Sequence, residues 1–204
     1  MSYQSFEQVL QKCHTEEKEF WRVILEDDMA ERNVSEEDSM EHMRATWDAM
    51  LLAAATYEGN LNSSSGLVGG DGRRMEEYIH SAVTESLCGE YVDTCIAGAL
   101  QMGESNACMK RIVAAPTAGG VLPAVLVPYF QKRCKDTDKI LKAMYVAAGI
   151  GQIIATRSSI SGAAGGCQAE IGAASSMAAG ALVYLQGGDC TQIATAAAMA
   201  MKNL

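Results

Sequence analysis

Hydrophobic positions in the first part of the chain recur with helical spacing. Phe6, Val9, Leu10 and Cys13 fall on one face of a helix. A second helix is predicted by the next apolar face, which consists of Phe20, Trp21, Ile24, Leu25 and Met29. The sequence therefore begins with at least two amphipathic helices.

A long third helix is predicted to start after Ser35. Ser35 followed by Asp38 resembles a capping box with Asp in place of Glu. Gly59 is the predicted stop. The predicted buried stripe consists of Met40, Met43, Trp47, Met50, Leu51 and Ala54. Methionine and tryptophan at this spacing are typical of core packing.

The composition changes after this helix. A loop rich in Ser and Gly over residues 60–72 leads to Arg73 and Arg74. Further helices are predicted over residues 75–86, 91–102, 122–132, 137–156 (with Thr137 as cap), 168–185 and 191–204. The chain is thus predicted to be all-α, with glycine-rich loops between helices. It is expected to form one domain over residues 1–204, with an N-terminal helical region (1–59) and a core (60–204).

The composition supports the all-α fold class and argues against two classes of binding partner. Aromatic residues make up only 6% of the chain, and abundant Ala and Met favour helices over sheets. The formal net charge of −9, with no basic stripe, argues against nucleic acid or an anionic membrane as a partner. No apolar run approaches the ~20 residues of a membrane span, and the start has no secretory pattern.

The cysteines indicate a reducing compartment. Seven are present, an odd number, and none forms a C-x-x-C pair. This fits reduced thiols in the cytoplasm better than a disulfide framework. It also provides no local zinc or ferredoxin-type motif. Cys95 and Cys108 lie in apolar helical stretches and are expected to be small core residues.

Cys167 stands apart from the other cysteines. It lies in SSISGAAGGCQAEIGAASSMAA, residues 158–179, where glycines precede it and a helix-forming run follows from Gln168. A thiolate at a helix N-terminus is stabilised by the helix dipole and by free N–H groups. Core packing is the alternative explanation of a cysteine followed by small residues.

The three histidines offer no comparable signal. His14, His42 and His80 lie in polar helical stretches and are predicted to be solvated surface residues. None forms a nucleophile–base pair with a nearby motif. Walker, dinucleotide-binding and nucleophile-elbow motifs are absent from the sequence.

Four stretches, in order, resemble one enzyme family. They are SSSGLVGGDGRRMEEYI (63–79), NACMKRIVAAPTAGG (106–120), SSISGAAGGCQAEIG (158–172) and SMAAGALVYLQGG (176–188). Together they resemble the iron–sulfur-dependent L-serine dehydratases, in the α chain. The resemblance implies deamination of L-serine to pyruvate and ammonia, with a [4Fe–4S] cluster acting as Lewis acid on the substrate hydroxyl.

The resemblance also implies site residues. Cys167 matches the first of three cysteine ligands of the cluster, and the other two are expected beyond Leu204, because relatives continue there. The chain is therefore expected to be truncated relative to the family. Substrate-binding roles are expected for the glycine-rich loops, specifically for Ser63, Ser65, Gly69, Asp71, Thr117 and Ser161. An ordinary flexible loop is the alternative at residues 63–71.

Two departures from the family leave other functions open. The loop at residues 116–120 is two residues shorter than in many relatives and lacks a cysteine found there. Together with the missing ligands, this keeps open a non-catalytic fragment or interaction module, while a cluster-dependent cysteine desulfidase is a third possibility.

The resemblance implies partners as well. These are L-serine and a separate β chain, in a homo- or hetero-oligomer. The final predicted helix carries Ile193, Ala197, Met201 and Leu204 on one face. This face is expected to stay exposed in the isolated chain and to promote self-association.

Overall fold

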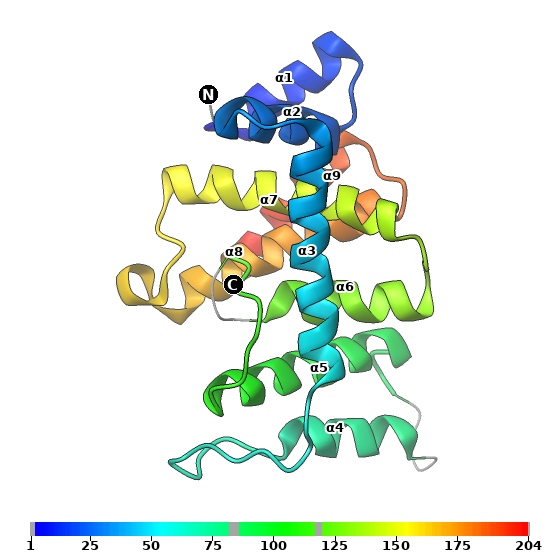
Figure 1. The fold of residues 1–204 in the computed structure, drawn as a ribbon, viewed down its shortest axis with the longest axis vertical. Helices are drawn as coiled ribbons and strands as arrows, with labels where there is room; N and C mark the ends of the chain where they lie inside the picture. The colour runs from blue at the N-terminus through cyan, green and yellow to red at the C-terminus, as the bar shows by residue number, and fades with distance from the viewer. Residues whose placement is uncertain (1–2, 82–85, 117–119, 204) are drawn as a thin grey trace. The chain divides into compact units, whose positions relative to one another are not determined.

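The computed structural model describes residues 3–81, 86–116 and 120–203. Over these residues the chain forms nine α-helices and no β-strand (Figure 1), which confirms the all-α prediction. The helices are α1 (Phe6–Glu16), α2 (Phe20–Arg32), α3 (Glu36–Ala55), α4 (Asp71–His80), α5 (Glu90–Ala107), α6 (Val121–Lys132), α7 (Thr137–Arg157), α8 (Gly162–Leu185) and α9 (Cys190–Lys202). Within the described ranges, no helix has the length and apolar content that crossing a bilayer requires.

The helices group into two compact units. Unit 1 comprises Met1–Ala45 and Asp136–Leu204, and unit 2 comprises Thr46–Lys135. The helix α3 contributes residues to both units. The boundaries of the units lie between residues 45 and 46 and between residues 135 and 136.

Unit 1 is built around α7, which packs on α2 and α8. Ile140, Leu141 and Ile150 of α7 are fully buried. At Gly180 of α8 the backbone lies directly against α7, because a Cβ there would collide with Cδ1 of Ile150. The buried hydroxyls of Ser39 and Tyr145 lie 2.6 Å apart and join α3 to α7.

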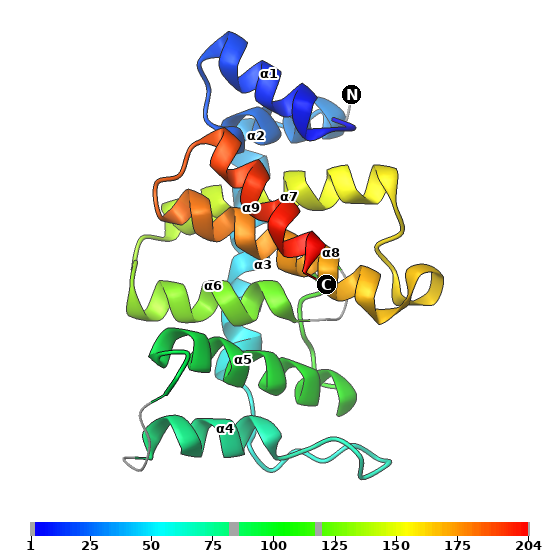
Figure 2. The ribbon, with the colours of Figure 1, turned by 180° about the vertical axis from the view of Figure 1, so that it is seen from behind.

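The final helix packs within unit 1 rather than standing free. Figure 2 shows α9 crossing α8, and the two helices are in contact. Ile193 and Ala197 are each only 1% exposed, and the hydroxyl of Ser176 in α8 donates to the carbonyl of Ala197 at 2.9 Å. Half of the predicted exposed face is therefore covered. Met201 is 37% exposed, and Leu204 lies outside the described residues.

Unit 2 is a stack of helices. α5 packs on both α4 and α6, and both ribbon views show the three side by side (Figures 1 and 2). Of the predicted α3 stripe, Trp47 and Met50 are buried and the other four residues are partly exposed. The Trp47 ring packs edge-on against Phe130 of α6, with ring centroids 5.5 Å apart.

One of the two predicted helix caps is confirmed. Asp38 N donates to Ser35 Oγ at 3.1 Å, and Ser35 N donates to the Asp38 carboxylate, so the capping box is present. Asp189 and Gln192 form another box at the start of α9, which the sequence reasoning missed. The cap of α7 is Asp136 rather than Thr137, since its carboxylate accepts from Lys139 N.

Several helix boundaries differ from the prediction, including the end of α4, at His80 rather than residue 86, and the start of α8, at Gly162 rather than residue 168. α3 ends at Ala55 rather than near Gly59. Directly after this end, the Thr56 hydroxyl donates to the carbonyl of Leu52 at 2.8 Å. α4 begins at Asp71, four residues before the predicted start, and α5 continues past Met102 to Ala107. Both of the latter changes involve one buried side chain, Glu104, described below.

Candidate functional site

The loop at residues 63–68 is closed by its own hydrogen bonds. Ser63 N donates to the carbonyl of Val68 at 2.8 Å, and Val68 N donates to Ser63 Oγ at 3.1 Å. Leu67 N donates to Ser65 Oγ at 3.3 Å, and the two serine hydroxyls lie 3.1 Å apart. Each hydroxyl thus accepts from the backbone, and since one of the two donates to the other, one O–H of the pair remains available as a donor.

Gly69 and Asp71 connect this loop to α4. Gly69 packs against residues 61 and 62, where a Cβ would collide with the Leu61 carbonyl and lie 2.6 Å from Asn62 Oδ1. Its φ of 153° also disfavours other residues. The Asp71 side chain is 59% exposed, and its carboxylate accepts a hydrogen bond from Arg74 at 2.9 Å. Asp71 therefore presents a carboxylate at the surface beside the serine loop.

A buried carboxylate occupies the N-terminus of α4. Glu104 in α5 is only 2% exposed, and its Oε1 accepts from Asp71 N at 2.5 Å and Gly72 N at 3.0 Å. Its Oε2 accepts from the Tyr57 hydroxyl at 2.5 Å. Burial, together with this bond, raises the pKa of Tyr57 and keeps the phenol protonated as a donor. The carboxylate thus uses the N–H groups that an anionic ligand at this helix end would need.

Sequence reasoning missed Glu104 because it ended the helix at Met102. One signal was available, since Glu104 follows an apolar helical run and is separated from it only by Gly103. A carboxylate buried on the inner face of a helix requires hydrogen-bond donors, and the N–H groups at the start of α4 provide them.

Cys167 lies at a break within α8. Gly166 has φ 77° and ψ 171°, which interrupts the helix, and Cys167 is the first residue after the break. This confirms the prediction that Cys167 stands at or just before a helix N-terminus. The side chain is exposed and carries a free thiol.

Ser161 starts the short helical turn that precedes the break. Its N–H donates to Ser159 Oγ at 3.3 Å, and its carbonyl accepts from Gly165 N at 2.9 Å. Its own hydroxyl makes no cap bond to α8. A partly buried hydroxyl therefore remains available near the thiol-bearing turn.

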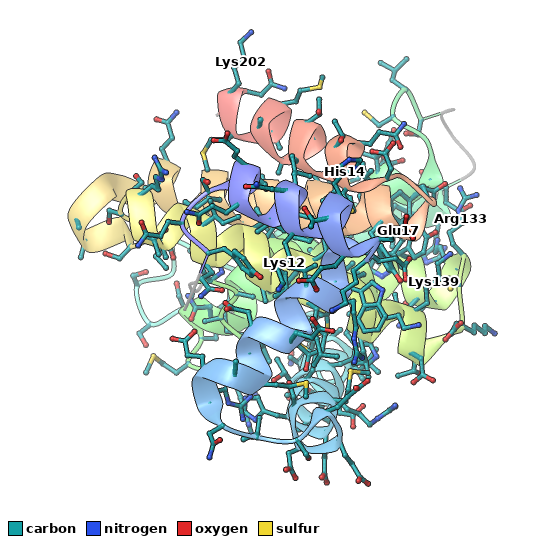
Figure 3. All side chains as sticks on the ribbon, turned by 90° about the horizontal axis from the view of Figure 1, so that it is seen from above. Lys12, His14, Glu17, Arg133, Lys139 and Lys202 are labelled. Carbon is teal, nitrogen blue, oxygen red and sulfur yellow. The ribbon has the colours of Figure 1, made fainter. Side chains whose placement is uncertain are left out.

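The predicted site residues divide between the two units. Ser63, Ser65, Gly69 and Asp71 belong to unit 2, while Ser161 and Cys167 belong to unit 1. Thr117 lies outside the described residues. His14 on α1, labelled in Figure 3, is exposed, as are His42 and His80, in agreement with the predicted surface positions.

The described residues do not form a complete iron–sulfur site. A [4Fe–4S] cluster is held by several cysteine thiolates. In the parts of the chain that the structure describes, no three His, Cys, Asp or Glu side chains gather into a group that could hold a metal ion. Cys167 alone fits the requirement of an exposed thiol at a favourable backbone position.

Comparison with known proteins places the chain in a family. The family model described as "Serine dehydratase alpha chain" matches residues 15–204. A "Probable L-serine dehydratase, alpha chain" of Bacillus subtilis is 36% identical over 184 residues, covering 89% of this chain and 61% of that relative. The "L-serine dehydratase, alpha chain" of Peptoniphilus asaccharolyticus is 34% identical over 203 residues, 97% of this chain and 68% of the relative.

A third relative matches over a shorter region. The "L-serine dehydratase TdcG" of Escherichia coli is 44% identical over 108 residues, which is 52% of this chain and 24% of the relative. The chain thus spans about three fifths to two thirds of the two alpha chains and a quarter of this longer protein. The match over residues 15–204 includes every loop described above, and the chain belongs to the serine dehydratase alpha chain family.

Proposed function

We propose that the chain is the α subunit of an L-serine dehydratase, which converts L-serine to pyruvate and ammonia. The single observation that carries the proposal is the family match over residues 15–204, which spans the serine loop and the Cys167 turn. The names of the Bacillus and Peptoniphilus relatives support the same activity.

The reaction sets clear demands on the protein. Water leaves L-serine by cleavage of the Cα–H and Cβ–O bonds, which gives an enamine that tautomerises to an imine. Hydrolysis of the imine releases pyruvate and ammonia. The protein must anchor the ammonium and carboxylate groups, accept the α proton and stabilise the departing hydroxide.

We propose that the glycine-rich loops bind the substrate. One O–H of the Ser63–Ser65 pair remains available as a donor for a carboxylate, and the Asp71 carboxylate can accept from an ammonium group. Ser161 and Thr117 are proposed to add hydroxyl contacts. Glu104 is not proposed to touch the substrate, since all of its observed hydrogen bonds are to donors of the protein.

We propose that Cys167 contributes one thiolate to a [4Fe–4S] cluster, which when bound supplies a Lewis acid for the substrate hydroxyl. The remaining ligands are proposed to come from residues other than those the structure describes, in keeping with the absence of a three-ligand group among the described residues. A separate β chain is the proposed partner in a hetero-oligomer, in keeping with the alpha-chain names of the relatives.

The test uses the chain, extended after Leu204 by residues resembling the family's continuation, together with its β chain under anaerobic conditions. Pyruvate formation from L-serine is expected, and Cys167→Ser is expected to abolish it and to lower the iron content. The matched control is Cys88→Ser, because Cys88 is also an exposed free cysteine. Full activity and iron content in Cys167→Ser would refute the ligand role, and wild-type protein that forms no pyruvate would refute the proposed activity.

A further inference from the structure

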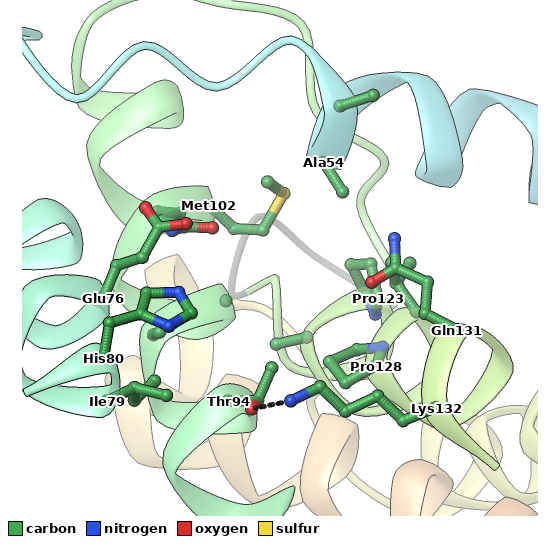
Figure 4. Close-up of a pocket in the computed structure, with 16 residues that line it drawn as sticks. Ala54, Glu76, Ile79, His80, Thr94, Met102, Pro123, Pro128, Gln131 and Lys132 are labelled. Carbon is green, nitrogen blue, oxygen red and sulfur yellow. Dashed lines mark hydrogen bonds between the residues drawn. The ribbon is translucent and has the colours of Figure 1, made fainter. Parts of the chain in front are cut away.

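A cavity in unit 2 is lined by α4, α5, α6 and the end of α3 (Figure 4). Its volume is about 280 Å³, near the lower end of ordinary ligand sites, so it suits a small metabolite. None of its lining residues belongs to the serine loop or to the Cys167 turn.

Groups of opposite charge face each other across this cavity. Glu76 and His80 come from α4, and Figure 4 shows them on the side opposite Lys132 and Gln131 of α6. Lys132 Nζ donates to Thr94 Oγ1 at 3.1 Å and to Glu90 at 2.6 Å. One wall thus offers an acceptor for a cation and the other offers donors for an anion.

The polar groups have unused hydrogen-bonding capacity. Within the described part of the chain, the side chains of Glu76, His80, Gln101 and Gln131 make no hydrogen bond or ion pair. An ammonium group has three N–H donors, and Lys132 directs two of them to Glu90 and Thr94. The groups can therefore bind a ligand without breaking a contact of the fold.

The rest of the lining is apolar. It comes from Ala97 and Met102 of α5 and from Pro123, Val127 and Pro128 of α6. Such a surface excludes water from an aliphatic group and strengthens the neighbouring polar contacts. A ligand with two opposite charges and a short aliphatic side chain would match all three parts of the cavity.

We propose that this cavity binds a small zwitterionic α-amino acid with an aliphatic side chain. Glu76 accepts from the ammonium group, and Lys132, supported by Gln131, donates to the carboxylate. The side chain lies against the prolines and Met102. This site goes beyond the proposed function, because it requires neither the cluster nor the serine loop.

The first test is calorimetric titration of the full chain with L-valine. Two analogues each lack one charge: 3-methylbutanoate has no ammonium group and 2-methylpropan-1-amine has no carboxylate. Each analogue is expected to bind at least about tenfold more weakly than L-valine, as expected when a charge-assisted contact is lost. Equal binding of either analogue, or no binding of L-valine, would overturn the proposal.

Matched variants locate the binding. Glu76→Gln and Lys132→Met are each expected to weaken L-valine binding by about tenfold. Glu77→Gln and Lys135→Met change neighbouring charges outside the lining and are expected to bind normally. Circular dichroism confirms that each variant is folded. Equal losses in the control variants would place the ligand elsewhere and contradict the assignment.

Discussion

The hydroxyl of Tyr57 lies 2.5 Å from a carboxylate oxygen of Glu104, and both residues are fixed at the start of α4. Tyr57 follows α3 and Glu104 is in α5, so a single buried carboxylate joins three segments of unit 2. The same carboxylate determines where the serine loop ends and α4 begins. Its charge is compensated by hydrogen bonds alone, without an ion pair to a described residue.

Glu104→Gln is expected to lower the free energy of unfolding by about 1–3 kcal/mol. The reason is that the amide NH₂ would face either the Tyr57 hydroxyl or the N–H groups of Asp71 and Gly72, which donate to the carboxylate in the wild-type protein. Urea denaturation followed by circular dichroism measures the change. The control is Glu58→Gln, a 56% exposed partner of Lys110, expected to change stability by less than about 0.5 kcal/mol. Similar values for the two variants would show that Glu104 is not a structural anchor.

Gly166 and Gly103 are expected to respond in opposite directions to alanine. Gly166→Ala places a side chain at φ 77° and should cost about 1–2 kcal/mol. Gly103 lies inside α5 with open space around its Cβ position, so Gly103→Ala should stabilise the protein by about 0.5–1 kcal/mol. Thermal unfolding of both variants tests this. A stabilised Gly166→Ala would mean that the break before Cys167 is not required.

Cys190, the first residue of α9, is expected to react as a thiolate near neutral pH. A hydrogen bond from the Cys13 thiol, with further bonds from backbone N–H groups, outweighs burial and lowers the pKa of Cys190 to about 7. The same bond, together with burial, raises the pKa of Cys13. Alkylation of Cys190 by iodoacetamide should therefore rise with pH and level off above about 7, whereas an ordinary thiol levels off above about 8.5.

The removal of Cys13 provides the control. In Cys13→Ala the pKa of Cys190 should move back up, and alkylation should level off at higher pH. Since the folded-state pKa of Cys190 is the lower one, its contribution to stability is present above the unfolded value and is lost as the pH falls through about 7. An alkylation profile that is unchanged in Cys13→Ala would contradict the hydrogen bond as the cause.

The chain alone, incubated anaerobically with ferrous iron and sulfide, is expected to hold much less than one cluster per molecule. The reason is that one matched thiolate cannot hold a [4Fe–4S] cluster. Iron analysis and visible absorption measure the outcome. Stoichiometric iron with cluster absorption would mean that other cysteines serve as ligands, and Cys88→Ser and Cys134→Ser would then identify them.

Local signals in the sequence predicted much of the fold. The apolar spacing in α1 and α2, the Ser35–Asp38 box and the glycines before Cys167 all act over a few residues, and the structure has each of them. The start of α4 was predicted wrongly because its cap, Glu104, lies 33 residues away in the chain. Local patterns cannot reveal such a partner.

The identities of the candidate residues could be predicted from the sequence, but the contacts that they make could not. The resemblance identified Ser63, Ser65 and Asp71, yet their hydrogen bonds to the loop and to Arg74 depend on backbone geometry. The cavity between Glu76 and Lys132 depends on how α4, α5 and α6 stack. Residues from separate helices converge there, and no motif in the sequence marks them.

The close contact between Gly180 and Ile150 fixes the position of α8 thirteen residues after Cys167. From Gly180 back to Cys167 the helix extends about 20 Å, at 1.5 Å per residue. A tilt of about five degrees at the contact would therefore displace the sulfur by about 2 Å, comparable to a metal–sulfur bond length. A bulkier residue at position 180 would thus displace the Cys167 sulfur without contacting the loop before it. The position of the Cys167 sulfur therefore depends on aliphatic packing inside unit 1, about 20 Å along the helix from the chemistry that Cys167 is proposed to serve.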